Sequence, residues 1–483
     1  MNTDSVRPAV TELRLSAFKT HRGVTLPLGP LTLLSGESGS GKSSVLQAYE
    51  MLARLGSGEP LARAVQEVVG GPSACVPAGA RPDGQGRRGF RIGCTVDGPA
   101  GPVSLDLAVQ AEPELRIVGE RLTGGGETLL TTALTDPTRP AVQAAWHTAG
   151  ATPVTRAPLP DDRLGTSLLP LRVAGKTEGQ RLVLAAAEQV VVALRSAFVC
   201  DPRPEAMRRS GAGELSGGGP GGRGPDGGGG RGGGARGGRA GSTGGCATKA
   251  GGGGGGDGAA GAWGTRGRRG SGGAGEAGGW GRAAEEEPDE GRLRSSCDNL
   301  PAVLERTSRE CARRHAVLVA AMREACTGPV DGLRAVPREE GAAEEGAAAP
   351  PVSGRGGPAA ARHTGQEVRE SGVRAVLDRG ALGEMPVEQL GDGELRFLAL
   401  ALVLLTGPGV LAMDPAGEIP SAQQQMTVMA DGMDRCMDRR QARELVSLAV
   451  RMADRGHVRL LGTVRDPSVA EGLPGVQVLH LGT

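Results

Sequence analysis

One eight-residue segment combines glycines, a lysine and a hydroxyl side chain at the spacing of a phosphate-binding loop. Residues 36–43 read GESGSGKS and fit the pattern G-x-x-x-x-G-K-[ST] at every fixed position. Glycines let backbone N–H groups curl around phosphate oxygens, Lys42 supplies a positive charge, and the Ser43 hydroxyl is a ligand for Mg²⁺. The sequence therefore predicts a site for a nucleotide and Mg²⁺ formed by Gly36, Glu37, Ser38, Gly39, Ser40, Gly41, Lys42, Ser43 and Ser44.

A chance match is the alternative, because Gly is 84 of the 483 residues. Two features favour a genuine loop. Lys42 is one of only four lysines in the chain. The segment also lies between an apolar strand pattern, residues 30–35, and a helical pattern that starts at Ser44, which is the context that a phosphate-binding loop requires.

The elements that must position this loop indicate an α/β protein. Residues 13–34 have the pattern of two or three strands, and residues 91–98 and 102–110 form a hairpin pattern. Farther along the chain, apolar strands at 409–413, 457–464 and 475–481 alternate with helical patterns. We expect a mixed, mostly parallel central sheet with N-terminal antiparallel strands and a helical middle.

Composition changes divide the chain into five predicted parts. Residues 1–208 form an N-terminal lobe with the phosphate loop, and 366–483 form a C-terminal lobe. Between them, 293–336 form a helical segment with one helix over 299–325. The segments 209–292 and 337–365 are low-complexity linkers, and the first is predicted to be disordered because it is rich in Gly. Its Arg-Gly repeats leave a nucleic-acid-binding segment open as the alternative.

Charge, cysteines and hydropathy exclude several classes of protein. The net charge of +1 excludes a globally basic nucleic-acid coat. The eight cysteines form no Cys-x-x-Cys pair, which argues against a zinc site. The longest apolar run, 397–405, is far shorter than a membrane span, and the first residues lack the pattern of a signal peptide. We expect a cytoplasmic protein without a membrane partner.

Two segments resemble RecF/SMC-type ABC ATPases, which are also described as AAA-family ATPases. They are LRLSAFKTHRGVTLPLGPLTLLSGESGSGKSSVLQAYEML, residues 13–52, and LGDGELRFLALALVLL, residues 390–405. The resemblance implies a split ATPase head that binds ATP and Mg²⁺ and forms an ATP-dependent homodimer. In this family the signature residues, here Gly391, Asp392 and Gly393, face the γ-phosphate on the other head. DNA is then a possible partner, with a role in DNA repair or genome maintenance. A simple turn before a core helix remains the alternative for Gly391–Gly393.

The sequence departs from this family at the positions that support hydrolysis. Gly391 replaces the signature serine, and Arg465 stands at the switch histidine. The acidic strand end reads AMDPAGE, so either Asp414 takes the place of the catalytic Glu, or it is the Mg²⁺-side Asp and Glu418 is the remaining acid. We assign Asp414, Glu418 and Arg465 as candidate catalytic residues, and Ser43 with Asp414 as candidate metal ligands. An active ATPase and a nucleotide-gated switch with little hydrolysis both remain open.

Two further features have open interpretations. The segment DPRPEAMRR, residues 201–209, either brings Arg208 near the site or the dimer interface, or forms a surface turn that ends a strand. His21 and Arg22 precede the phosphate loop, as solvated residues or as contacts on the nucleotide side.

Overall fold

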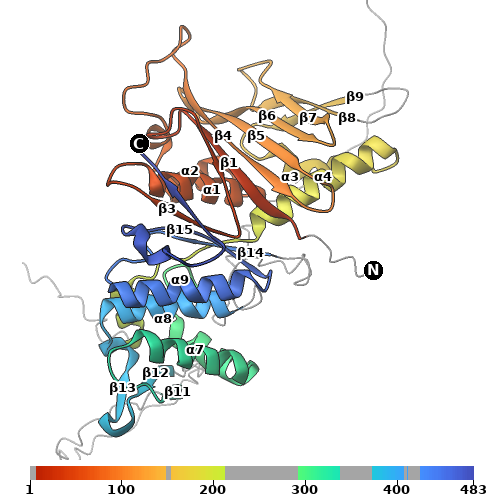
Figure 1. Cartoon of the computed structure of the whole chain (residues 1–483). Helices are drawn as coiled ribbons and strands as arrows, with labels where there is room; N and C mark the ends of the chain where they lie inside the picture. Colours follow the sequence, from red (N-terminus) through yellow and green to blue (C-terminus); the bar gives the residue numbers. More distant parts are fainter. Residues whose placement is uncertain are drawn as a thin grey trace, which may run out of the picture. The chain divides into compact units, whose positions relative to one another are not determined.

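The computed structural model describes residues 7–147, 154–212, 292–337, 373–406, 411 and 425–482 (Figure 1). These residues belong to one compact unit, and a second unit, Ser216–Glu287, lies outside the described residues. Most of the two low-complexity segments also lies outside them. The domain bounds and the disorder of the Gly-rich tract therefore stay predictions.

The N-terminal half forms an antiparallel sheet whose described strands have the order β2-β1-β4-β5-β6-β7-β8-β9. These strands are β1 (Ala9–Ser16), β2 (Val24–Pro27), β4 (Arg88–Asp97), β5 (Val103–Glu112), β6 (Arg116–Gly124), β7 (Glu127–Ala133), β8 (Ala141–His147) and β9 (Val154–Pro160). Buried and more exposed residues alternate along β5 from Val103 to Val109. One face of the sheet therefore packs on a core that it shares with helices α1 (Lys42–Gly56) and α4 (Glu178–Arg195).

The second sheet is parallel and brings together strands from both ends of the chain. Its order is β10-β14-β15-β3-β16, and every neighbouring pair is parallel. The strands are β3 (Leu31–Ser35), β10 (Ala197–Val199), β14 (Met426–Ala430), β15 (Val458–Thr463) and β16 (Val476–His480). Because all strands run in one direction, the residues that follow β3, β14 and β15 meet at the same edge. The mixed α/β architecture agrees with the prediction.

Helices cover both faces of the parallel sheet, since neighbouring strand residues join different cores. Met429 and Leu461 belong to the core with α1 and α4, whereas Val428 and Leu460 belong to the other core. That second core includes α8 (Asp392–Leu405) and α9 (Arg439–Ala453), which lie side by side (Figure 1). It also includes residues of α6 (Leu300–Glu310) and α7 (Ala312–Ala325).

Shorter elements complete the described part of the chain. A small antiparallel sheet has the order β11-β12-β13, with β11 (Gly332–Pro337), β12 (Val373–Asp378) and β13 (Glu384–Pro386). The remaining α-helices are α2 (Leu61–Val69), α3 (Gly165–Arg172) and α5 (Pro204–Ala212). The 3₁₀ turns are η1 (Pro72–Cys75), η2 (Gly380–Leu382), η3 (Val387–Gln389) and η6 (Pro467–Ala470).

The single helix predicted over 299–325 is wrong, because the chain forms two helices that meet at Cys311. The backbone of Cys311 is extended, with φ −149° and ψ 81°. Its N–H closes α6 on the carbonyl of Thr307, and its own carbonyl accepts the first hydrogen bond of α7 from His315. The extended residue changes the direction of the chain, and both helices bury apolar residues in one core.

Candidate functional site: a phosphate loop and an acidic strand end

The phosphate loop runs from the end of β3 to the start of α1, and close neighbours require glycine at both of its ends. A Cβ at Gly36 would lie 2.3 Å from the Leu481 carbonyl oxygen, and φ there is +142°. A Cβ at Gly41 would lie 2.6 Å from Nε2 of His21, and φ is +94°. Any other residue would be strained at these positions. His21 is buried, and its Nε2 lies 3.1 Å from the Gly41 carbonyl oxygen, so it supports the loop backbone.

The amino end of α1 and the Lys42 ammonium give this loop the properties of an anion site. The helix begins at Lys42, directly after the loop, so its positive end faces the loop, and no acidic residue in the first turn offsets that charge. The ammonium donates to the carbonyls of Gly36 (2.6 Å) and Glu37 (2.9 Å). The Lys42 side chain therefore crosses the loop. The backbone N–H groups of the same loop would hold a phosphate.

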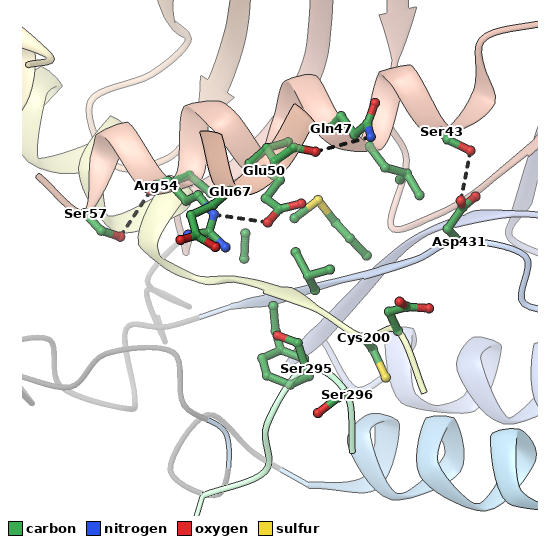
Figure 2. Close-up of a pocket in the computed structure, with 18 of the residues that line it drawn as sticks. Ser43, Gln47, Glu50, Arg54, Ser57, Glu67, Cys200, Ser295, Ser296 and Asp431 are labelled. Atoms are coloured by element: carbon green, nitrogen blue, oxygen red, sulfur yellow. Dashed lines mark hydrogen bonds and ion pairs between the residues drawn. The ribbon is translucent and has the colours of Figure 1, made fainter. Parts of the chain in front are cut away.

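A carboxylate at the end of β14 faces the loop. Ser43 Oγ donates to Asp431 Oδ2 at 2.9 Å, as Figure 2 shows for these two side chains. The second carboxylate oxygen, Oδ1, accepts from Thr463 Oγ1 at 2.6 Å. Thr463 Oγ1 in turn accepts from the N–H of Gly432 at 2.7 Å. Three residues from the ends of different elements thus converge at one edge of the parallel sheet.

Sequence reasoning missed Asp431. It placed the metal-side acid at Asp414, after a strand predicted over 409–413, with Glu418 nearby. Asp414 and Glu418 lie outside the described residues, so their roles stay predictions. The signal that could have found Asp431 is the short, mostly apolar run MTVMA, which ends directly before this Asp and forms β14 between two parallel strands.

The residue after Asp431 carries no functional side chain. It is Gly432, with a left-handed φ of +60°, a conformation in which a glutamate would be strained. The next carboxylate, Asp434, accepts the N–H groups of Arg465 (2.8 Å) and Asp466 (3.0 Å) through Oδ2. Asp434 therefore fixes the backbone at Arg465, whose exposed side chain follows β15.

The turn that begins α8 contacts the loop after Asp431. A Cβ at Gly393 would lie only 2.2 Å from the Cys436 carbonyl oxygen, so only glycine permits this approach. Gly391 is the N-cap of α8; its N–H donates to Glu394 Oε2 at 3.3 Å, and its carbonyl accepts from Leu395. The three candidate signature residues thus lie at the start of a helix that packs beside residues 431–436, called the acidic loop below.

Arg208 does not lie in a surface turn, which was one of its two interpretations. It belongs to α5, and its guanidinium donates to the carbonyls of Glu388 (3.1 Å) and Leu390 (2.9 Å). It also forms an ion pair with Asp392 Oδ1 at 2.6 Å. Arg208 therefore anchors the turn before α8 to helix α5.

A cavity of about 660 Å³ opens beside Ser43 and Asp431 and follows α1 (Figure 2). Glu50 and Arg54 on α1 line it together with Glu67 of α2. Burial raises the pKa of Glu50, although its ion pair with Arg54 at 3.1 Å acts in the opposite direction. Residues of β10 and its continuation, including Asp201, form another part of the wall.

The donor set at the loop suits Mg²⁺ bound together with phosphate. In the described ranges no three His, Cys, Asp or Glu side chains gather as a metal site. Ser43 and Asp431 offer two hard oxygen ligands, and Mg²⁺ commonly takes few protein ligands beside phosphate oxygens and water.

None of the described helices has the length and apolar character of a membrane span.

Neither a protein-family model nor a curated protein matches the sequence. Solved structures similar to this chain include an SMC head bound to the C-terminal winged-helix domain of ScpA (TM-score 0.41, 10% identity, 95% of this chain and 90% of that chain). Another is the SMC head domain from Thermotoga maritima (TM-score 0.35, 10% identity, 96% and 91%). A third is the recombination mediator RecF with ATP (TM-score 0.19, 15% identity, 27% and 30%).

Proposed function

We propose that this chain binds ATP with Mg²⁺ at the loop Gly36–Ser44, and that Asp431 completes the metal side of the site. The hydrogen bond between Ser43 Oγ and Asp431 Oδ2 carries this proposal. These residues are 388 positions apart in the sequence, yet the fold brings together the hydroxyl and the carboxylate that hold Mg²⁺ in phosphate-loop NTPases.

Each residue has a separate role in binding. The backbone N–H groups of the loop and the amino end of α1 bind phosphate oxygens. Lys42 exchanges its two carbonyl partners, Gly36 and Glu37, for oxygens of the β- and γ-phosphates. Bound Mg²⁺ would neutralise phosphate charge, held by Ser43 and Asp431, while Thr463 keeps the carboxylate oriented.

We further propose that ATP acts here mainly as a switch that is hydrolysed slowly. The supporting observation is Gly432, whose left-handed backbone directly follows Asp431 and offers no carboxylate beside the proposed metal-side acid. Residue 432 therefore cannot act as a general base, a role that contributes about 10²–10⁴-fold to activation of the attacking water. Faster hydrolysis is the second candidate function, and it depends on Asp201, the carboxylate that lines the same cavity as Ser43 and Asp431.

Equilibrium binding of ATP tests the site. Lys42→Ala should weaken binding by about 10–100-fold, because a hydrogen bond to a charged group contributes about 1.5–3 kcal/mol. Asp431→Asn should weaken binding only when Mg²⁺ is present. The exposed lysine variant Lys176→Ala is the matched control and should bind like the wild type. Absence of ATP binding by the wild type, or unchanged binding by Lys42→Ala, would contradict the proposed site.

Steady-state turnover distinguishes the switch from the faster enzyme. We expect a rate below about 1 s⁻¹, the lower end of typical enzyme turnover. A higher rate that Asp201→Asn abolishes would favour the second candidate. Duplex DNA added to the same assay tests the partner that the family resemblance implies.

A further inference from the structure

Arg396 is a buried cation in an otherwise apolar stretch of α8. The residue is only 3% exposed, and its neighbours Leu395 and Phe397 are fully buried. A guanidinium removed from water is costly unless it is hydrogen-bonded. Its partners therefore indicate what it does in this fold.

Those partners are backbone carbonyls at the edge of the candidate site. Nη1 donates to Pro202 at 2.6 Å, and Nη2 donates to Asp431 at 3.3 Å and to Gly432 at 3.1 Å. No carboxylate within the described chain pairs with this guanidinium. Arg396 thus holds main-chain positions directly, and two of the three belong to the acidic loop.

Asp431 is consequently fixed on two sides. On one side, its carbonyl is held by α8 through Arg396. On the other, its carboxylate lies between Ser43 of α1 and Thr463 of β15. The direction of the carboxylate depends on both, because rotation of the backbone at residues 431–432 would move it away from Ser43.

We propose that Arg396 is a positioning residue for the metal side of the site, acting through the carbonyls of Asp431 and Gly432. The inference rests on the proposed function. It also connects the turn at the start of α8 with Mg²⁺ binding, because Arg396 lies one helical turn beyond Asp392 on the same helix. Through Pro202 the same side chain reaches the segment that leads into α5.

Arg459 provides a matched control. It is also buried, at 8% exposed, and its Nη2 donates to two backbone carbonyls, Val10 at 3.2 Å and Leu28 at 2.8 Å. These carbonyls belong to the N-terminal strands and their connection, away from Asp431. Arg459→Met therefore removes the same kind of buried cross-link without touching the acidic loop.

The test is a Mg²⁺ titration of ATP binding by the full chain, with Arg396→Met, Arg396→Lys and Arg459→Met beside the wild type. We expect Arg396→Met to bind ATP like the wild type when Mg²⁺ is absent. The Mg²⁺ concentration needed for half of the effect should rise about 10–100-fold, as for residues that orient metal ligands. Arg396→Lys should recover part of this loss, because one ammonium can replace only part of the fork.

Arg459→Met should leave the Mg²⁺ midpoint unchanged, although its thermal unfolding temperature falls. A wild-type midpoint in a folded Arg396 variant overturns the inference, and so does an equal shift in Arg459→Met. If Arg396→Met does not fold, Arg396→Lys decides by the same criterion. Asp431→Asn separates failure of the proposed Mg²⁺ site from failure of the role of Arg396. If Asp431→Asn loses the Mg²⁺ effect while the Arg396 variants keep it, only the positioning role of Arg396 fails. If the wild type shows no Mg²⁺ effect, the proposed function fails.

Discussion

The single hydroxyl of Thr463 makes two hydrogen bonds at the metal side of the site. It donates to Asp431 Oδ1 and accepts from the N–H of Gly432, so it links the carboxylate to its own following peptide. The residue is buried, at 2% exposed, and water cannot easily replace it. Such partners of a metal ligand select one orientation of its carboxylate before the metal binds.

Thr463→Val should therefore weaken the Mg²⁺ dependence of ATP binding. The substitution keeps the shape of the side chain but removes the donor to Asp431, and we expect the Mg²⁺ midpoint to rise about tenfold. A Mg²⁺ titration measures it. Thr463→Ser retains the hydroxyl and is the control; equal midpoints for the Val and Ser variants would contradict this role.

At the scale of elements, helix α8 is held at its first turn from two directions. Arg208 of α5 binds the carbonyls before the helix and the side chain of Asp392. Gly393 allows the helix to approach the Cys436 carbonyl. The turn is therefore part of the same packed edge as Asp431, although residues 391–393 lie 38 to 40 positions before it in the sequence.

Gly393→Ala should destabilise the protein, and Gly391→Ala should not. The new methyl group at residue 393 meets a backbone oxygen, and overpacking of this kind costs about 1–3 kcal/mol. At residue 391 the nearest atom lies 3.9 Å from the added carbon. Denaturant unfolding of both variants measures the difference, and equal free energies of unfolding would refute the close approach.

Arg208→Ala should lower the free energy of unfolding by about 1 kcal/mol, because its two carbonyl bonds and one partly exposed ion pair are lost together. Arg209→Ala is the neighbouring control, since Arg209, among the described residues, donates to a carbonyl of its own helix. Chemical denaturation of the pair gives the comparison. A loss no larger than that of the control would mean that α5 does not hold the turn.

The sequence predicted the elements with strong local patterns and missed those defined by distant neighbours. The strand and helix on either side of the predicted phosphate loop, β3 and α1, have clear patterns and form as expected, as do α9 and β15. β14 is only five residues long and has no periodicity, so its place between β10 and β15 depends on tertiary pairing. Asp431 was missed for that reason. The metal-side acid was assigned instead to Asp414, which follows the more obvious apolar run at 409–413.

At the scale of the whole molecule, the segments flanking residues 213–291 are joined to each other. The N–H groups of Asp201 and Arg203 donate to the carbonyls of Ser295 and Ser296. Cys200 Sγ and Cys297 Sγ, both buried, lie 3.9 Å apart. Residues 200–203 and 295–297 thus hold the two ends of the intervening segment next to each other.

Replacement of residues 213–291 by a short Gly/Ser linker should leave ATP binding unchanged. Loop length changes the free energy of folding only slowly, by about 0.6 kcal/mol for each doubling, so a shorter loop is tolerated. ATP affinity and the thermal unfolding temperature measure the result. Loss of ATP binding would show that the removed segment contributes to the site; loss of nucleic-acid binding alone would favour the Arg-Gly interpretation.

ATP with Mg²⁺ should convert the protein from a monomer to a homodimer, as the family resemblance implies. The Gly391 backbone is exposed at the start of α8, where a second phosphate could bind. Gly391→Arg adds bulk at a position with free space around its Cβ, so it should fold and stay monomeric. Light scattering with and without ATP measures the mass, and a dimer of Gly391→Arg would contradict a role for this turn.

Strand β3 lies between β15 and β16, and Ser35 Oγ is 2.6 Å from Nδ1 of His480, 445 residues later in the sequence. During translation, the phosphate loop therefore emerges from the ribosome long before the strands that support it. Until the C-terminal strands are made, the nascent chain lacks both neighbours of β3 and also Asp431 and Thr463, which complete the proposed site.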